Sequence, residues 1–167
     1  MTFDDGGTMI DLTDQWNPDQ ALPEVAGDMD VDQLNKLKVL VVDDDWQMTR
    51  LVRANLRSDR VEVAEAGTAE DGLRILRAGG IDLILLDVNL PDMSGWDVLA
   101  LIRASETLRN IPVIVVSVEP ADGALVRRFK PEGYMQKPLD VRALVGRMNR
   151  LASRRYGQDL SGQQVEA

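Results

Sequence analysis

The feature that most constrains this chain is a run of apolar residues that ends in an aspartate. Segment 81–87 reads IDLILLD, and VNLPDMSG follows it directly. A run of this kind predicts a strand buried on both faces, as in parallel sheets. The Pro, Asp, Ser and Gly that follow predict a loop. Asp87 is therefore expected at the carboxyl end of a central strand, where open α/β sheets place their ligand sites.

Two further apolar runs also end in polar residues. Val39–Val42 is followed by Asp43-Asp44-Asp45, and Val113–Val116 is followed by Ser117. The carboxyl ends of parallel strands meet at one edge of a sheet. The acidic residues that follow the first run, the carboxylate of Asp87 and the hydroxyl of Ser117 are therefore expected to lie together at that edge.

Strand and helix patterns alternate from Lys38 onward. Short strands are predicted at 61–66 and 134–135, and the segment between Glu119 and Lys130 is the weakest helix. Thr68-Ala69-Glu70-Asp71 resembles a helix capping box, and Gly79-Gly80 ends that helix. Other helices are indicated by the apolar spacing of Met48, Leu51, Val52 and Leu56, by Trp96, Leu99 and Ile102, and by Val141, Leu144, Val145, Met148, Leu151 and Ala152. Five strands alternating with five helices predict an α/β fold with a doubly wound five-stranded parallel sheet.

The two ends of the chain differ from this folded region. Residues 1–36 contain nine acidic residues and one basic residue, a net charge of −8, with no sustained period. They are interpreted as an acidic, disordered arm, with a short turn over 31–37. We assign residues 37–152 to the folded domain and residues 153–167 to a disordered tail. No apolar stretch approaches the roughly 20 residues that span a bilayer, and the N-terminus lacks a signal pattern. A cytoplasmic protein is the expectation.

The composition limits the chemistry. The chain has no histidine and no cysteine, which excludes Ser-His and Cys-His relays, imidazole or thiolate metal ligands, and a phosphohistidine on this chain. Clustered carboxylates repel one another and need a cation. Oxygen ligands favour Mg²⁺, with Mn²⁺ or Ca²⁺ as alternatives. A carboxylate can also attack phosphorus to form an acyl phosphate. Ser117 offers a hydroxyl for that reaction and Lys137 a fixed cation.

The order and spacing of these motifs resemble the receiver domain of two-component response regulators, which has a flavodoxin-like (βα)5 fold. The matching pieces are VVDDD at 41–45, LDVNLPDMSG at 86–95, Ser117, and Lys137-Pro138. The resemblance covers about residues 38–152 and leaves both ends unexplained.

The resemblance implies a role for each site residue. Asp87 would be the phosphoacceptor, with Asp44 a direct Mg²⁺ ligand, Asp43 a ligand through water, and Asn89 a ligand through its backbone carbonyl. Ser117 would bond a phosphoryl oxygen as the switch hydroxyl. Lys137 would pair with the phosphoryl group, and its bond to Pro138 would be cis. Tyr134 would be the switch aromatic that rotates inward.

The chain departs from the family pattern at two places. Val118 follows Ser117 where the family commonly has Ala, and it is expected to narrow access to Asp87. The Pro- and Gly-containing stretch before the fifth strand predicts an irregular signalling surface. Asn89 and Glu119 resemble positions that tune hydrolysis in the family.

The implied function is a single-domain response regulator that takes a phosphoryl group from a phosphohistidine on another protein. The implied partners are a sensor histidine kinase or a histidine phosphotransfer protein, together with a downstream protein target. Nothing resembles a DNA-binding or enzymatic output domain, so neither nucleic acid nor a membrane is an expected partner. The oligomeric state, monomer or phosphorylation-promoted dimer, is left open. The chain is not expected to be an enzyme, although it would catalyse its own phosphotransfer and slow dephosphorylation.

Two other functions are considered. A receiver-like interaction domain without phosphorylation would leave the complete acid, hydroxyl and lysine set unexplained. A haloacid-dehalogenase-type phosphatase is suggested by the Asp-x-Asp pattern of Asp43 to Asp45, with Ser117 and Lys137 as its later motifs. That family needs a further acidic pair after the lysine, where only Asp140 is near, and gives no reason for Asp87.

The acidic arm suggests an additional hypothesis. The segment before the last strand, the final helix and the residues after it carry many basic residues. Electrostatic attraction would let the arm cover this side in part and compete with an acidic partner. The alternative is a solvated arm that only aids solubility. The basic residues are Arg127, Arg128, Lys130, Arg142, Arg147, Arg150, Arg154 and Arg155.

Overall fold

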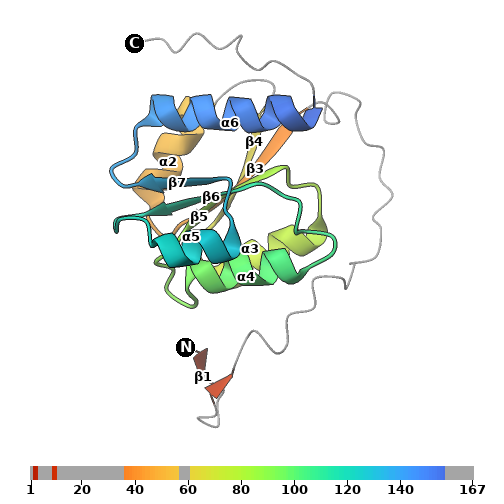
Figure 1. The fold of residues 1–167 in the computed structure, drawn as a ribbon, viewed down its shortest axis with the longest axis vertical. Coiled ribbons are helices and arrows are strands. Elements are labelled where there is room, and N and C mark those ends of the chain that lie inside the picture. The colour runs from red at the N-terminus through yellow and green to blue at the C-terminus, as the bar shows by residue number, and fades with distance from the viewer. Residues whose placement is uncertain (1, 4–8, 11–35, 57–60, 157–167) are drawn as a thin grey trace.

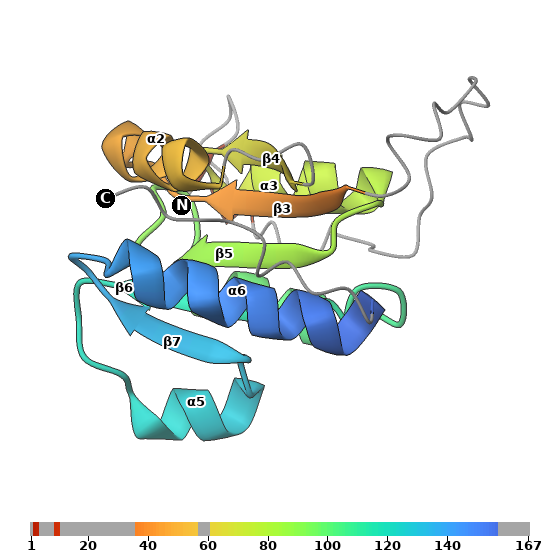
Figure 2. The ribbon, with the colours of Figure 1, turned by 90° about the horizontal axis from the view of Figure 1, so that it is seen from above.

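The computed structural model describes residues 2–3, 9–10, 36–56 and 61–156 (Figure 1). Its main sheet has five parallel strands in the order β4-β3-β5-β6-β7, visible side by side in Figure 2. The strands are β3 (Leu37–Val42), β4 (Val61–Ala66), β5 (Leu83–Asp87), β6 (Val113–Ser117) and β7 (Gly133–Gln136). This order is the flavodoxin-like one: β4 lies on one side of β3, and the later strands are added on the other side, beginning with β5. The predicted fold class is confirmed.

Five helices cover the two faces of this sheet (Figure 1). Buried residues of α2 and α6 share one side of the core, and those of α3 and α4 share the other. The short helix α5 lies beside α4. The helices are α2 (Trp46–Asn55), α3 (Ala69–Ala78), α4 (Gly95–Ala104), α5 (Gly123–Phe129) and α6 (Val141–Tyr156). In the described part of the chain, none of them is both long and apolar enough to cross a membrane.

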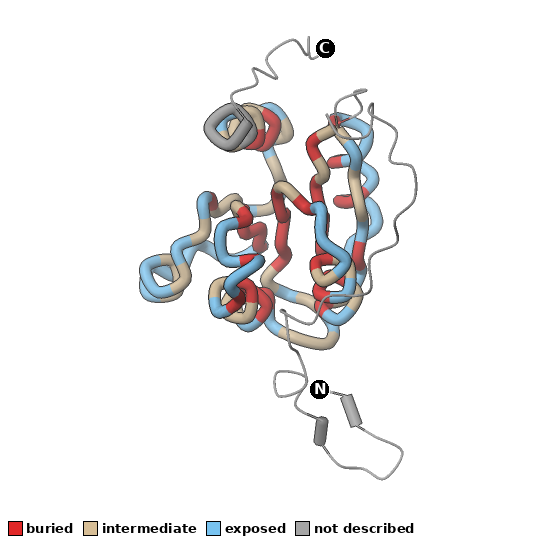
Figure 3. The backbone as a smooth tube through the Cα atoms, turned by 90° about the vertical axis from the view of Figure 1, so that its right-hand side faces the viewer, coloured by how far each residue is buried: buried red, intermediate tan, exposed pale blue. Residues whose placement is uncertain are grey.

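The central strand β5 is apolar from Leu83 to Leu86 because both of its faces are buried. Leu83 and Leu85 pack with α2 and α6, while Ile84 and Leu86 pack with α3 and α4. All four are at most 1% exposed, and Figure 3 shows the buried residues gathered along the middle of the molecule. Burying each such side chain contributes about 1.5–3 kcal/mol. The sheet that carries Asp87 is therefore anchored from both sides.

Helix α3 begins and ends as its sequence predicts. The Thr68 hydroxyl oxygen accepts a hydrogen bond from the Asp71 N–H at 3.1 Å. The Thr68 hydroxyl in turn donates a hydrogen bond to Asp71 Oδ2 at 3.2 Å. Hydrogen bonds from Arg74 and then from Thr68 lower the pKa of the Asp71 carboxyl. At the other end Gly79 has a φ of 80°, which favours glycine.

Three details differ from the sequence prediction. Leu51 was expected in the apolar stripe of α2 but is 42% exposed. The buried side of α2 consists of Met48, Thr49 and Val52, and Leu51 lies outside this stripe. Helix α6 continues to Tyr156 and not to Ala152. The sequence contains no helix breaker until Gly157, so the helix extends into the tail that was predicted to be disordered.

The third difference lies in the predicted disordered arm. Strand β1 (Thr2–Phe3) pairs antiparallel with β2 (Met9–Ile10). The sequence between them contains Asp5-Gly6-Gly7, residue types that favour chain reversal. The rest of the arm and nearly all of the predicted turn at 31–37 lie outside the described residues. The hypothesis that the arm covers the basic side therefore stays a prediction.

Helix α5 ends at a strained position. Lys130 has φ 47° and ψ 58°, the left-handed conformation, and its N–H donates to the Val126 carbonyl at 2.9 Å. This conformation costs a non-glycine residue about 1–2 kcal/mol, and glycine is the usual residue there.

Lys130→Gly is therefore expected to raise the free energy of unfolding by about 0.5–1 kcal/mol, after the extra chain entropy of glycine is subtracted. Urea denaturation measures the change. Arg127→Gly, at an exposed position inside the same helix, serves as the control and should lower stability by about 1 kcal/mol. A loss of stability in both variants would contradict the strain at Lys130.

Candidate functional site

Three aspartates meet at the carboxyl edge of the sheet. Asp43 and Asp44 follow β3, and Asp87 is the last residue of the neighbouring strand β5. Their carboxylate oxygens lie within 4.8 Å of one another. Asp43 and Asp87 are only 5% and 4% exposed, whereas Asp44 is exposed. Two buried carboxylates and one solvent-facing carboxylate thus surround a single point.

Lys137 joins the two buried acids. Its Nζ lies 2.8 Å from Asp43 Oδ2 and 2.7 Å from Asp87 Oδ2. The residue follows β7, and its N–H donates to the Ser117 carbonyl at 2.7 Å. This backbone bond fixes the position of the Lys137 main chain next to the end of β6. The Lys137–Pro138 peptide bond is cis, as the resemblance implied.

Burial and charge set the protonation behaviour of this cluster. Burial is the largest influence and raises the pKa of Asp43, and the charge of Asp87 raises it further. Hydrogen bonds from Lys137 and the Asp45 N–H oppose this rise only in part. Burial lowers the pKa of Lys137, but the hydrogen bonds to Asp43 and Asp87 outweigh it and raise that pKa overall. The acids therefore retain unfavourable charge density that a further cation would relieve.

The remaining oxygens of the buried acids are held by backbone amides. Asp43 Oδ1 accepts from the Asp45 N–H at 2.9 Å, and Asp87 Oδ1 accepts from the Asn89 N–H at 3.0 Å. The Asp45 side chain itself caps α2 through the Gln47 N–H. With all-oxygen donors and one exposed carboxylate, the cluster suits a hard cation such as Mg²⁺ that keeps several waters. The Asn89 backbone carbonyl stays a predicted ligand.

Ser117 lies beside the acids, at the end of the next strand. It is fully buried, and its Oγ accepts from the Glu119 N–H at 3.1 Å. The strand that ends in Ser117 pairs directly with β5, with Val116 opposite Asp87. Ser117 therefore lies at the predicted edge of the sheet, and the bond of its hydroxyl to a phosphoryl oxygen stays a prediction.

Tyr134 belongs to a row of three aromatic rings. Its hydroxyl donates to the Glu119 carbonyl at 2.8 Å, and its half-buried ring stacks on Trp96 with centroids 6.3 Å apart. Trp96 also stacks on Phe129 at 6.2 Å. The sequence placed Trp96 only in the apolar spacing of a predicted helix, but its ring joins α4, α5 and β7. The predicted inward rotation of Tyr134 would break both of its contacts.

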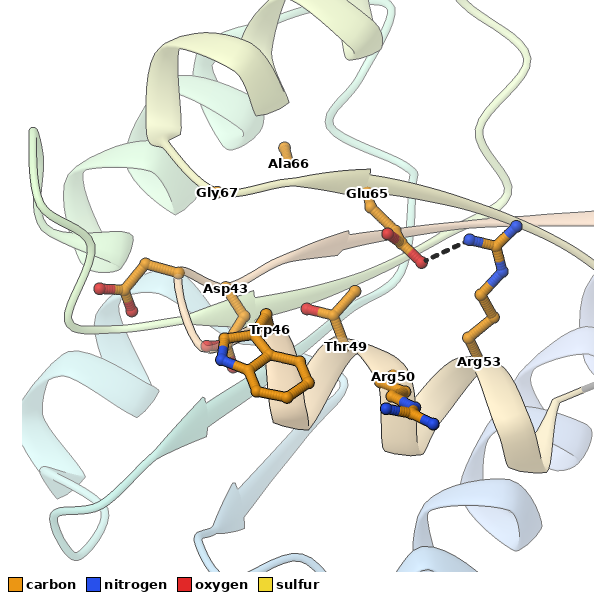
Figure 4. A pocket seen from close by; sticks show the side chains of 9 residues that line it. Asp43, Trp46, Thr49, Arg50, Arg53, Glu65, Ala66 and Gly67 are labelled. Carbon is orange, nitrogen blue, oxygen red and sulfur yellow. Dashed lines mark hydrogen bonds and ion pairs between the residues drawn. The ribbon is translucent and has the colours of Figure 1, made fainter.

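A hollow of about 330 Å³ lies next to the acids, between α2 and the end of β4 (Figure 4). Its lining includes Asp43, Asp44, Trp46, Arg50, Glu65 and Gly67. Trp46 is 65% exposed, and Arg53 pairs with Glu65 at 3.3 Å. Sequence reasoning missed this hollow, because no motif signals the space between a helix and a neighbouring strand end.

Comparison with known proteins agrees with this arrangement. The sequence profile of the response regulator receiver domain matches residues 39–149. The chain belongs to the response regulator receiver family. Chemotaxis protein CheY of Pseudomonas aeruginosa is 31% identical over 124 residues, which cover 72% of this chain and all of CheY. The cell cycle transcriptional regulator CtrA of Caulobacter vibrioides is also 31% identical, but the match covers only 52% of CtrA.

Solved structures agree on the fold. A CheY-like receiver domain protein from Methanospirillum hungatei has a TM-score of 0.65 and 25% identity. The match covers 74% of this chain and 99% of that protein. Membership in the receiver family separates this chain from the dehalogenase-type phosphatases considered above.

Proposed function

We propose that this receiver is a phosphorylation-dependent signalling module in which Asp87 accepts a phosphoryl group from a phosphohistidine on a partner protein. The observation that carries the proposal is the contact of one lysine with two buried aspartates. An Asp87 oxygen attacks phosphorus, the P–N bond to the donor imidazole breaks, and the imidazole nitrogen keeps the electron pair. Water later cleaves the acyl phosphate, so the module acts as a self-dephosphorylating acceptor rather than as an enzyme with a separate substrate.

Each site residue has a chemical task in this proposal. When bound, Mg²⁺ would neutralise the carboxylates and the phosphoryl oxygens, with Asp43, Asp44, Asp87 and the Asn89 carbonyl as its surroundings. Lys137 already lies 2.7 Å from the acceptor oxygen, so it can move from the carboxylate to the incoming phosphoryl group. Ser117, buried at the end of β6, would donate its hydroxyl to a phosphoryl oxygen.

The surface near the site is suited to a protein partner. Trp46 and Val118 are 65% and 59% exposed, and both belong to segments that follow strands at the acidic edge. Aromatic side chains such as Trp46 are enriched at protein contact surfaces. We assign this region to the phosphodonor, a sensor histidine kinase or a histidine phosphotransfer protein. A downstream protein target and a cytoplasmic location remain predictions of the sequence.

Incubation with Mg²⁺ and acetyl phosphate, followed by intact mass measurement, tests the proposal. We expect one phosphoryl adduct that disappears when a chelator is added. Asp87→Ala should abolish the adduct because it removes the carboxylate that is proposed to attack phosphorus, the last residue of β5. Asp97→Ala, which removes an exposed acid from α4, is the control and should keep the adduct. An undiminished adduct in Asp87→Ala would show that the acceptor is another residue.

Val118 gives a second test of the site. Its side chain is exposed directly after the buried Ser117, and the sequence predicts that this branched residue narrows the approach to Asp87. Val118→Ala is expected to speed phosphorylation by acetyl phosphate several-fold, on the order of a factor of 5 for about 1 kcal/mol of relieved crowding. Initial rates at saturating Mg²⁺ measure it. Equal rates for both chains would disprove the access argument.

A further inference from the structure

Asp92 links the loop after the acceptor strand to a helix that lies far from it in sequence. Asp92 Oδ1 accepts from the Ala69 N–H at 2.9 Å, and Oδ2 accepts from the Glu70 N–H at 2.9 Å. These amides open α3, where N–H groups have no partner within the helix. Thr68 satisfies the next amide, that of Asp71. A carboxylate from another loop thus completes the helix start, where negative charge is favourable.

The loop that carries Asp92 also shapes the acceptor site. Backbone contacts join the two ends of the loop. Asn89 and Ser94 form an isolated antiparallel β-bridge, and the Gly95 N–H donates to the Val88 carbonyl at 2.8 Å. At its start, the Asn89 N–H orients Asp87 Oδ1. These bonds fix the internal shape of the loop, whereas the two bonds of Asp92 fix its position against α3.

We propose that Asp92 is a positioning residue for the metal site, an inference that rests on the function proposed above. Asp92 holds the loop against α3 and so fixes the position of Asn89, whose backbone carbonyl is a predicted Mg²⁺ ligand beside Asp87. Without Asp92 the loop keeps its internal turn but can move as a unit, carrying Asn89 with it. Residues that orient metal ligands through hydrogen bonds typically change metal affinity by 10–100-fold when they are removed.

Thr68→Ala is a matched control for Asp92→Ala. Both changes remove hydrogen bonds from the first turn of α3, and both are expected to lower stability through the loss of a cap. Only Asp92, however, belongs to the loop next to Asp87. A purely structural role would give the two variants the same Mg²⁺ affinity.

The experiment is a Mg²⁺ titration of the full chain, followed by the amide NMR signals of Asp44 and Asn89. We expect Asp92→Ala to raise the Mg²⁺ dissociation constant about tenfold, while Thr68→Ala leaves it unchanged. Asp92→Asn retains one acceptor oxygen and should fall between wild type and Asp92→Ala, which keeps the test usable if the alanine variant does not fold. Without Mg²⁺, the Asn89 amide signal should shift in both Asp92 variants and not in Thr68→Ala.

The outcomes separate this inference from the proposed function. Wild-type Mg²⁺ binding with equal dissociation constants in the Asp92 and Thr68 variants would overturn the positioning role and leave the phosphoacceptor assignment intact. A wild-type chain that binds no Mg²⁺ and takes up no phosphoryl group would overturn both. Restoration of phosphorylation in Asp92→Ala by excess Mg²⁺ would support the inference, because weakened affinity is the defect it predicts.

Discussion

Replacing Lys137 with alanine is expected to lower the free energy of unfolding of the metal-free chain by about 2–4 kcal/mol near neutral pH. The Lys137 Nζ lies within 2.8 Å of one oxygen of Asp43 and one of Asp87, and both carboxylates are at least 95% buried. Removing the ammonium leaves two buried negative charges side by side. The loss is smaller than for a fully enclosed pair, since the Lys137 side chain is 16% exposed and water can enter the space that it leaves.

The loss of stability in Lys137→Ala should depend on pH in a defined direction. The folded-state pKa of Asp43 is raised above 3.8, so its stabilising contribution is present in acid and is lost as the pH rises through the folded-state pKa. The pKa of Lys137 is raised above 10.5, so its contribution is fully present at neutral pH and is lost only at alkaline pH. Without Lys137 the pKa of Asp43 rises further. The deficit of the variant should therefore shrink as the pH falls from about 7 toward 4.

Urea denaturation at several pH values, with and without Mg²⁺, measures this effect. Millimolar Mg²⁺ should restore part of the lost stability, because a ligand that binds only the folded chain stabilises it. Lys38→Ala is the control: its Nζ lies 3.8 Å from Glu62 in an exposed pair, which is worth about 0–1 kcal/mol. If both lysine variants lost the same small amount at every pH, the buried cluster would not be under electrostatic stress.

The sheet and its acidic edge were predictable because their signals are local. Buried runs such as Leu83–Leu86 contain only apolar residues, and a carboxylate or hydroxyl directly after such a run lies at the strand end whatever the rest of the fold does. The capping residue Thr68 likewise bonds an amide only three residues away. Short-range chemistry of this kind is readable from sequence.

Features that depend on packing between distant segments were missed. The bonds from Asp92 to α3 span 22 and 23 residues, and nothing in the loop sequence distinguishes Asp92 from an ordinary turn residue. The exposure of Leu51 depends on where α2 meets the sheet and α6, which helical spacing alone does not settle. Trp96 appeared to be an ordinary apolar position because its ring partners, Phe129 and Tyr134, come from later elements.

Gly95→Ala should be among the most damaging single substitutions in the described part of the chain, although it adds only a methyl group. A Cβ on Gly95 would overlap the backbone carbonyl oxygen of Asp87 and lie 2.8 Å from the Cα of Val88. Both obstacles are main-chain atoms, so no side chain can rotate to make room. The start of α4 would have to move away from the acceptor strand, breaking the 2.8 Å bond from the Gly95 N–H to the Val88 carbonyl.

We expect Gly95→Ala to lower the free energy of unfolding by about 3 kcal/mol or more, at the upper end of overpacking effects. Any folded fraction should also take up the phosphoryl group poorly, because the same shift moves the backbone of Asp87. Gly67→Ala is the matched control at the same edge of the sheet: no atom lies within 4 Å of its added Cβ, so stability should change by less than about 1 kcal/mol. Urea midpoints and phosphoryl adducts for both variants decide the matter. A Gly95→Ala chain as stable and as readily phosphorylated as the Gly67→Ala chain would show that α4 does not need this close approach to hold the acceptor loop.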